Sequence, residues 1–309
     1  MSTTPLTVSF PSEELLASFP PLPEGVEPIV WDLSADADRA SIDLVLLPFG
    51  RPDIQRRLEG VRTRLVQTQA IGWDHLADVI PAGHRLANGA TIQETATAEL
   101  TLALVLAGQR DLAWHLGNQA RGHWGARSAP GLADRRVLIL GYGGLGFEIE
   151  RRLGAFDVAE VVRVARSAKT HRGLEVHGLD RLHELLVDVD VLIVTAALNP
   201  SSIGLVDADV LAALPDGALV VNVARGRVVD QPALLAELTA GRLRAALDVT
   251  DPEPLPAEHP LWRAPGLIIT PHVGGDTAAL APRREALYLR QIGHLLAGRE
   301  PENVVLDRR

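Results

Sequence analysis

A glycine-rich turn between an apolar strand and a helix constrains the fold of this chain more than any other feature. Val137 to Leu140 form an apolar run that predicts a buried strand, and Gly141-Tyr142-Gly143-Gly144-Leu145-Gly146 follows it directly. Leu145, Ile149 and Leu153 then recur every four residues, which predicts a helix. This strand, turn and helix are typical of the first unit of a doubly wound nucleotide-binding sheet.

The spacing of the glycines indicates a phosphate-binding turn. Gly141 permits the tight turn, Gly143 lets the backbone approach a pyrophosphate, and Gly146 lets helix and strand pack closely. The helix N-terminus, at Gly144 and Leu145, offers N–H groups to the phosphates. The pattern therefore predicts a dinucleotide site. A tight turn without a ligand, or a nucleotide-like ligand such as S-adenosylmethionine, remains an alternative.

The end of the second strand of this sheet predicts the choice of cofactor. An acidic residue there would hold a ribose 2′-hydroxyl, but the sequence reads Arg166-Ser167, with Lys169 nearby. Arg166 can bind a 2′-phosphate and Ser167 can donate to it. We therefore expect a preference for NADP(H), with NAD(H) as the second cofactor. Because 29 of the 30 basic residues are arginine, Arg166 as an ordinary exposed arginine is the competing interpretation.

Apolar runs alternate with helical patterns along the chain, which predicts an α/β fold with parallel strands. A long helical pattern over about 93–116 leads from one domain to the next, and a last helix over about 282–297 returns to the first. We expect a nucleotide-binding domain at 99–281, inserted in a smaller substrate domain formed by 1–98 and 282–309. The expected strands are Thr7–Phe10, Pro28–Trp31, Leu44–Leu47 and Leu65–Gln69 in the small domain, and Arg136–Leu140, Val161–Ala165, Val191–Thr195, Leu219–Val223, Ala245–Val249 and Leu267–Thr270 in the other.

Composition excludes several classes of protein. A length of 309 residues with 47% hydrophobic residues suits two domains, and no apolar run is long enough to span a membrane. We see no secretory signal at the start. The chain has no cysteine, which excludes disulfides and cysteine-ligated metals and is compatible with the cytoplasm; we expect no metal site. With a net charge of −9 and dispersed basic residues, we expect no nucleic-acid partner.

Three polar segments in the second half each follow a predicted strand, and they carry complementary chemistry. Arg225, Glu253 and His272 lie in these segments. Ligands of open α/β sheets bind beyond the carboxyl ends of the strands, so the three side chains can converge. A histidine oriented by a carboxylate can exchange the proton of a hydroxyl group, and an arginine can bind and polarise a carboxylate-bearing carbonyl compound. Taken singly, each is more often a solvated or structural residue.

Together these motifs resemble the D-isomer-specific 2-hydroxyacid dehydrogenases, which include glyoxylate/hydroxypyruvate reductases and phosphoglycerate dehydrogenases. The resemblance covers most of the chain, including the loop Ala70 to Asp74, the arginine segment Asn222 to Asp230 and Pro271-His272. It implies a Rossmann cofactor domain inserted in a discontinuous, flavodoxin-like substrate domain. It also implies a catalytic set of Arg225, Glu253 and His272, cofactor contacts by Thr97, Thr195, Val223, Asp248 and Gly274, and substrate contacts by Ile71, Gly72 and Trp73.

The resemblance implies hydride transfer between NAD(P)H and a small 2-keto acid, such as glyoxylate or hydroxypyruvate, in a homodimer. Alternatives are a dehydrogenase of another small anion on the same fold, or a nucleotide-sensing protein similar to corepressors. Thr195-Ala196-Ala197 stands where many relatives carry His-x-Pro, so the usual contacts there do not transfer directly. Trp73 is large for the substrate loop, and Asp276 replaces a commonly small residue, so the sequence leaves the exact substrate open.

Overall fold

The computed structural model describes residues 4–50 and 52–309, and the chain divides into two compact units. Unit 1 is formed by Met1–Gln93 and Thr277–Arg309, and unit 2 by Glu94–Asp276. The sequence placed these boundaries at 98/99 and 281/282. The first three residues of the expected small domain lie outside the described residues.

Unit 1 contains a six-stranded sheet in the order β14-β5-β4-β3-β1-β2. Strands β1 to β5 are parallel, and β14 pairs with β5 in the antiparallel sense. The order 2-1-3-4-5 of the parallel strands is that of flavodoxin-like folds, as the family resemblance implies. The strands are β1 Leu6–Phe10, β2 Val26–Val30, β3 Leu44–Leu46, β4 Leu65–Gln67, β5 Arg85–Ala87 and β14 Val304–Asp307.

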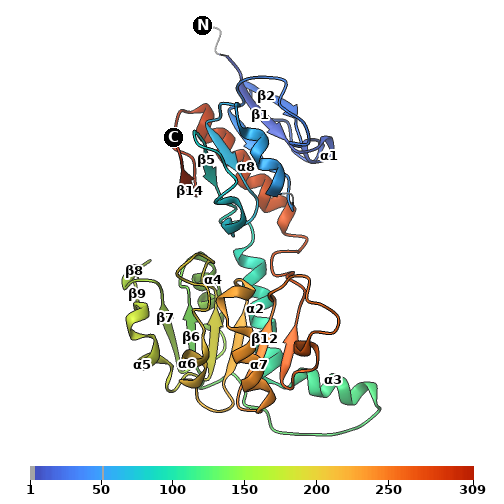
Figure 1. Cartoon of the computed structure of the whole chain (residues 1–309), viewed down its shortest axis with the longest axis vertical. Helices are drawn as coiled ribbons and strands as arrows, with labels where there is room; N and C mark the ends of the chain where they lie inside the picture. The colour runs from blue at the N-terminus through green and yellow to red at the C-terminus, as the bar shows by residue number, and fades with distance from the viewer. Residues whose placement is uncertain (1–3, 51) are drawn as a thin grey trace. The chain divides into compact units, whose positions relative to one another are not determined.

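Two apolar cores hold the sheet of unit 1, one on each face. On one face, Val8, Leu44 and Leu46 pack with the apolar side of helix α8, Leu280–Leu296, which crosses the sheet in Figure 1. On the other face, Val45 and Val66 pack with the short 3₁₀ helices and their loops. The remaining helical segments of this unit are α1 Glu13–Ala17 and the 3₁₀ helices Pro52–Leu58 and Asp74–Leu76.

Unit 2 is built on six parallel strands in the order β13-β12-β11-β10-β6-β7. Strand β7 lies on one side of β6, and β10, β11, β12 and β13 follow one another on the other side of β6. The strand order therefore reverses between β6 and β10. Ligands of doubly wound sheets bind at such a switch point. The strands are β6 Arg136–Leu140, β7 Glu160–Val164, β10 Val191–Val194, β11 Leu219–Asn222, β12 Arg244–Leu247 and β13 Leu267–Ile269.

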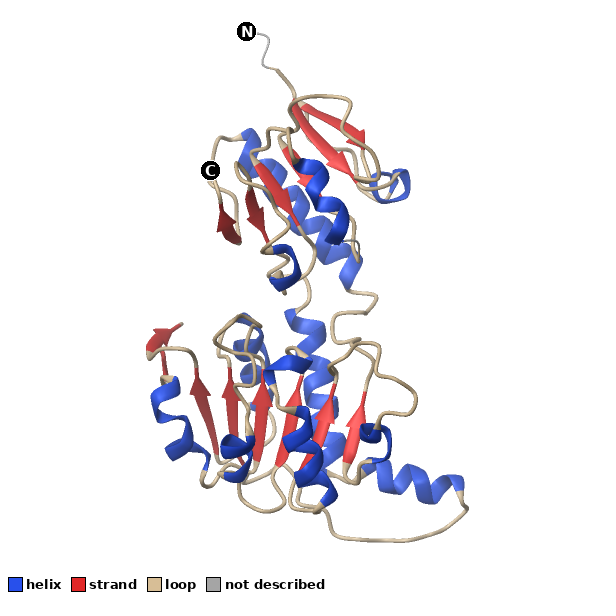
Figure 2. Cartoon of the chain, in the orientation of Figure 1, coloured by secondary structure: helices blue, strands red, loops and turns tan. Residues whose placement is uncertain are grey.

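Helices cover both faces of the sheet in unit 2 (Figure 2). Alternate strand residues explain this, because Val137 and Ile139 pack with α2 and α4, whereas Leu138 and Leu140 pack with α5, α6 and α7. The strands are therefore apolar on both sides, as the sequence predicted. The helices are α2 Glu94–Gln109, α3 Leu112–Ala120, α4 Gly144–Leu153, α5 Leu182–Leu186, α6 Ala208–Ala212 and α7 Gln231–Thr239, with 3₁₀ helices Leu179–Arg181, Gly226–Val228 and Pro260–Arg263.

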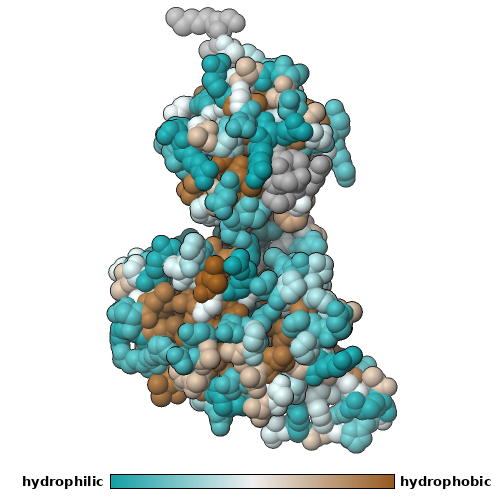
Figure 3. All heavy atoms as spheres, in the orientation of Figure 1, coloured by the Kyte–Doolittle hydropathy of each residue, from teal (hydrophilic) through white to brown (hydrophobic). Residues whose placement is uncertain are grey.

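The structure corrects the sequence-based prediction in two places in unit 2. The single helix expected over 93–116 is two helices, because Asp111 adopts a left-handed conformation (φ 52°) between α2 and α3. Aspartate tolerates this region better than most residues. An unexpected hairpin, β8 Lys169–His171 with β9 Leu174–Val176, follows β7. In the view of Figure 3, hydrophobic atoms gather on the surface of unit 2 among hydrophilic ones.

Candidate active site

The candidate site of unit 2 lies at the carboxyl edge of its sheet, where the strands lead into the segments singled out from the sequence. Gly141 follows β6, and Thr195 follows β10, across the point where strand order reverses. The Thr195 hydroxyl donates to the Gly141 carbonyl at 3.1 Å. The two central strands are therefore joined at their carboxyl ends, beneath the start of α4.

The turn after β6 requires glycine at its first position. Gly141 has φ 106°, and a Cβ atom there would lie 2.3 Å from the backbone nitrogen of Ala196. Its N–H and that of Tyr142 both donate to the Val164 carbonyl, at 2.8 and 2.9 Å. The turn thus lies directly against the loops that end β7 and β10, and no larger residue fits there.

Gly143 differs from Gly141, because the space next to it is open. It is the N-cap of α4, and a Cβ atom at this position would meet nothing closer than the Gly141 carbonyl oxygen at 4.0 Å. The absence of a side chain at Gly143 therefore leaves the space directly before Gly144 and Leu145 clear. This arrangement fits the phosphates of a dinucleotide.

The end of β7 carries positive charge and no carboxylate of its own. Arg166, Ser167 and Lys169 are all exposed. Within the described part of the chain, no hydrogen bond or ion pair of Arg166 is found. The nearby Glu160 begins β7, at the far end of the strand, where it pairs with Arg136 at 2.7 Å. Arg166 is thus available to an anion at the edge where the ribose of a dinucleotide would lie.

His272 and Glu253 meet at the same carboxyl edge, from the loops after β13 and β12. The His272 Nδ1 atom lies 2.7 Å from Oε2 of Glu253, and the two side chains are 46% and 37% exposed. The Thr250 N–H donates to Oε1 of Glu253 at 3.0 Å, which orients the carboxylate. With Nδ1 engaged by Glu253, Nε2 is the ring atom left for a ligand.

The surroundings of His272 favour the protonated form of its imidazole. The hydrogen bond with Glu253 raises the pKa of His272 above its ordinary value, although burial and the charge of Arg225 act against it. Burial acts to raise the pKa of Glu253, but the hydrogen bonds from His272 and Thr250 outweigh it, so this pKa is lowered. Glu253 therefore stays ionised while His272 titrates.

Arg225 lies in the loop after β11 and is close enough to influence both members of this pair. Its Nη1 donates to the Ala224 carbonyl at 2.8 Å, and its own carbonyl accepts from the Asn222 side chain at 3.0 Å. A Cβ atom at the next residue, Gly226, would overlap the Thr250 carbonyl at 2.0 Å. The arginine segment thus packs against the segment that carries Glu253.

The expected cofactor residues Thr97, Asp248 and Gly274 lie together. A Cβ atom at Gly274 would lie 3.0 Å from Oδ2 of Asp248 and 3.1 Å from Cγ2 of Thr97. Asp248 is buried, and its carboxylate accepts hydrogen bonds from the segment around His272, including one from the Gly274 N–H at 2.9 Å. Val223, after β11, is also buried, and its N–H donates to the Val194 carbonyl at 3.2 Å.

The expected substrate loop lies in unit 1, after β4. Asn88 fixes it by donating to the Ile71 carbonyl at 2.8 Å. The Ile71 N–H reaches the Gln93 side chain only at 3.4 Å, which is longer than most hydrogen bonds of this kind. No partner is found for the Gly72 N–H within the described residues. Trp73 is partly buried against the core of unit 1.

Sequence reasoning missed the residues that hold these loops. Gln231, the first residue of α7, accepts from the Asp251 N–H at 2.9 Å and donates to the Asp251 carbonyl. Thr250 donates from its backbone to Glu253, and Thr270 donates its hydroxyl to Asp248 at 2.6 Å. Thr250 and Thr270 are polar residues at the ends of predicted strands, and Gln231 directly follows the arginine segment Asn222 to Asp230; these positions are the only signals in the sequence.

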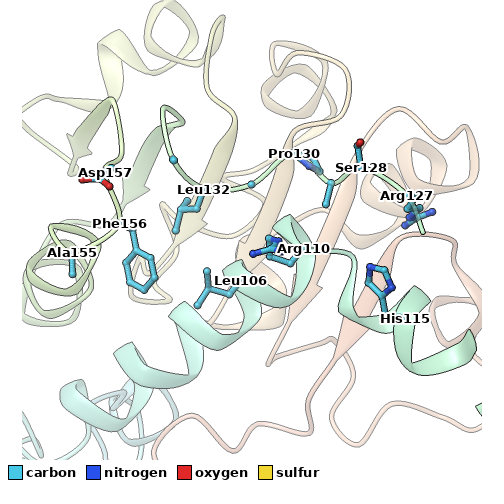
Figure 4. A pocket seen from close by; sticks show the side chains of 13 residues that line it. Leu106, Arg110, His115, Arg127, Ser128, Pro130, Leu132, Ala155, Phe156 and Asp157 are labelled. Atoms are coloured by element: carbon cyan, nitrogen blue, oxygen red, sulfur yellow. The ribbon is translucent and has the colours of Figure 1, made fainter. Parts of the chain in front are cut away.

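A pocket of 740 Å³ lies at the opposite edge of unit 2, away from these groups. Figure 4 shows the side chains that line it. Leu106, Arg110, His115 and Phe156 line it together with the loop 127–133, and this loop leads into the start of β6. Because the segments after the strands carry the reactive side chains, we place the candidate site at the carboxyl edge and not in this pocket.

Two features are absent from the described residues. Residues 4–50 and 52–309 contain no group of three or more histidine, aspartate and glutamate side chains placed to hold a metal ion. Nor does any helix in those ranges have the length and apolar character needed to cross a membrane.

Known proteins match this chain over both units. Residues 102–274 match the family model of the D-isomer specific 2-hydroxyacid dehydrogenase, NAD binding domain. Glyoxylate reductase/hydroxypyruvate reductase of Homo sapiens is 32% identical over 248 residues, which are 77% of this chain and 75% of the relative.

Two solved structures share the fold over nearly the whole chain. An NADPH-dependent glyoxylate/hydroxypyruvate reductase from Sinorhizobium meliloti, in complex with NADP and sulfate, has a TM-score of 0.82 at 26% identity and covers 98% of each chain. A D-isomer specific 2-hydroxyacid dehydrogenase from Xanthobacter autotrophicus Py2, in complex with NADPH and MES, has a TM-score of 0.82 at 28% identity and covers 99% of each chain.

Proposed function

The chain belongs to the D-isomer specific 2-hydroxyacid dehydrogenases, and we propose that it reduces small 2-keto acids, such as glyoxylate and hydroxypyruvate, with NADPH. The observation that carries this proposal is the hydrogen bond of 2.7 Å between His272 and Glu253, at the carboxyl edge that also holds Arg225. The solved relatives with NADP or NADPH support the choice of cofactor.

His272 is the proton donor in the proposed reaction. The reduced nicotinamide, when bound, supplies a hydride to the carbonyl carbon. The protonated imidazole then gives the Nε2 proton to the carbonyl oxygen, which becomes the hydroxyl group of the 2-hydroxy acid. Glu253 holds the imidazole through Nδ1 and favours its charged form, so the donor is ready near neutral pH. Proton uptake from solvent restores His272.

Arg225 binds the substrate in this proposal. The Arg225 guanidinium forms charge-assisted hydrogen bonds with the carboxylate and polarises the carbonyl group. Within unit 1, the backbone N–H groups of Ile71 and Gly72 are the proposed carboxylate-binding groups, because the Ile71 N–H makes only a long contact with Gln93. Trp73 limits the size of the substrate side chain.

The turn after β6 and the end of β7 would hold the cofactor. The N–H groups of Gly144 and Leu145 would bind the pyrophosphate, and Gly141 and Gly146 shape the turn. Arg166 and Ser167 would bind the 2′-phosphate of NADP(H). Thr97, Thr195, Val223, Asp248 and Gly274 would contact the nicotinamide half.

A panel of keto acids tests this function. We expect NADPH oxidation with glyoxylate and hydroxypyruvate, and a lower kcat/KM when NADH replaces NADPH. Formate with NADP and NAD serves as the test for oxidation of another small anion. Turnover of formate without any turnover of keto acids would replace the proposal by that alternative. Binding of NADPH without turnover of any substrate would favour a nucleotide-sensing protein.

We further propose that the enzyme is a homodimer formed through α3 and the loop that follows it. Leu112 and Leu116 lie on one face of α3 and are 45% and 64% exposed, and Trp124 is fully exposed. Exposed apolar side chains grouped in this way are typical of protein interfaces. Light scattering should give twice the mass of the chain, and Leu116→Glu should reduce it to that of a monomer. A monomeric native protein would contradict the proposal.

We propose a cytoplasmic location, which the absence of cysteine supports because such a chain needs no oxidising compartment. Fractionation of the cells that produce the protein should place it with cytoplasmic markers. Recovery with membrane or secreted fractions would contradict this location.

A further inference from the structure

His272 lies in a backbone conformation that its surroundings must maintain. Its φ is 55°, in the left-handed region that residues other than glycine adopt uncommonly. It follows β13 after Thr270 and Pro271, and its imidazole must still reach Glu253. A strained residue at a reactive position persists only when neighbouring groups fix it.

Asp248 fixes His272 by accepting hydrogen bonds from residues that precede and follow it in the chain. Oδ1 of the Asp248 carboxylate accepts from the Thr270 hydroxyl at 2.6 Å and from the Val273 N–H at 3.0 Å, and Oδ2 accepts from the Gly274 N–H at 2.9 Å. The Asp248 carbonyl also accepts from the His272 N–H at 2.7 Å. Asp248 is only 2% exposed, so water does not compete for these donors.

We propose that Thr270 and Asp248 are positioning residues for His272: the Thr270 hydroxyl fixes the Asp248 carboxylate, and the carboxylate holds the turn that aims the imidazole at Glu253. This inference rests on the proposed function, in which His272 transfers the proton. Neither residue needs to touch the substrate. A carboxylate can accept about four hydrogen bonds, so Oδ2 keeps one lone pair for a donor from the cofactor.

The charges around His272 agree with this arrangement. Glu253 and Asp248 face it with negative charge, and Arg225 faces it with positive charge. The hydrogen bond to Glu253 has the largest effect on the pKa of His272 and raises it, and the charge of Asp248 acts in the same direction. Loosening the turn weakens the contact with Glu253, so the pKa of His272 should fall.

Thr270→Val tests the inference, because valine keeps the shape of threonine and lacks the hydroxyl group. With glyoxylate and NADPH, kcat should fall roughly tenfold, since a misplaced proton donor loses this much or more. The KM for NADPH should change less than twofold. Thr270→Ser, which restores the hydroxyl, is the matched control and should recover most of kcat.

The imidazole titration of His272, measured by NMR without substrate, separates this inference from the proposed function. Thr270→Val should lower the pKa of His272, and Thr270→Ser should not. If Thr270→Val does not fold, Thr270→Ala gives the same test, because it also lacks the hydroxyl group and leaves every charge near His272 in place. An unchanged pKa and an unchanged kcat in a folded variant would overturn the positioning role. Failure of the native enzyme to turn over any keto acid would instead overturn the proposed function.

Discussion

His272 is the residue on which the proposed chemistry depends most directly. His272→Ala should reduce kcat with hydroxypyruvate by roughly 10²-fold or more, because the positioned proton donor is lost. The Kd for NADPH, measured by fluorescence titration, should stay close to that of the native enzyme, because the phosphate turn lies in another loop. A variant with native turnover would remove His272 from the mechanism.

The pairing of His272 with Glu253 predicts the pH dependence of reduction. The protonated imidazole is the active form, and Glu253 raises the pKa of His272, so kcat/KM should fall as pH rises through a value above the ordinary pKa. Glu253→Gln removes the charge. The pKa of His272 then falls, and the decline of kcat/KM moves to lower pH.

Glu258 offers a matched control, because it is an exposed glutamate in the same loop. Glu258→Gln should leave the pH profile of kcat/KM unchanged. If Glu253→Gln and Glu258→Gln behave alike, the 2.7 Å contact does not set the protonation of His272.

Arg166 predicts the preference for NADPH. A guanidinium that binds a 2′-phosphate contributes about 1.5–3 kcal/mol as a charge-assisted hydrogen bond. This corresponds to a roughly ten- to hundredfold preference. Arg166→Asp should reverse or abolish the ratio of kcat/KM for NADPH to that for NADH, while turnover with NADH stays near its native value.

The same change of charge at Arg263, an exposed arginine before β13, is the control for Arg166. Arg263→Asp should leave the ratio of specificity constants unchanged. A native enzyme that prefers NADH, or a ratio insensitive to Arg166→Asp, would show that Arg166 is only one of many surface arginines.

At the scale of secondary-structure elements, two glycines of the turn between β6 and α4 have different roles. We expect Gly143 to be needed for cofactor binding and Gly141 to be needed for folding. Gly143→Ala places a methyl group in open space, so the melting temperature should hardly change, but the methyl group obstructs the pyrophosphate. We expect NADPH affinity to fall roughly tenfold or more, which is about 1.4 kcal/mol. Calorimetric titration measures this directly.

Gly141→Ala should instead reduce the stability of the protein. Its methyl group would overlap the backbone of Ala196, and its φ of 106° is unfavourable for alanine. The free energy of unfolding should drop by about 3 kcal/mol or more.

The prediction for Gly143 has its own contradicting outcome. If Gly143→Ala binds NADPH normally, the cofactor phosphates do not lie at this turn.

The elements that the sequence predicted well are those with long apolar runs. All six parallel strands of unit 2 were predicted within one or two residues, because strands buried on both faces have few polar residues. β5 and β14 were missed because each has three or four residues and includes charged ones, Arg85 and Asp307. The break at Asp111 was missed because neither proline nor glycine marks it.

Some residues of the candidate site could be predicted from the sequence, and others could not. Arg225, Glu253 and His272 could be grouped from the sequence, because parallel strands bring their carboxyl ends to one edge. Thr270 and Gln231 could not, because their side chains contribute only one or two hydrogen bonds, to loops whose path depends on tertiary packing. The left-handed conformation of His272 has no local signal either.

In the whole molecule, the proposed site residues belong to two units. Unit 2 carries the phosphate turn, the proton-transfer pair and Arg225, and unit 1 carries the loop with Ile71 and Gly72. We propose that this enzyme reduces a 2-keto acid to the D-isomer of a 2-hydroxy acid at the expense of NADPH.

The most direct test is the reaction of hydroxypyruvate with NADPH, with the glycerate product resolved by its chirality. We predict that one D-glycerate forms for each NADPH oxidised, and that NADH supports a slower reaction. Absence of glycerate, or formation of L-glycerate, would contradict the account.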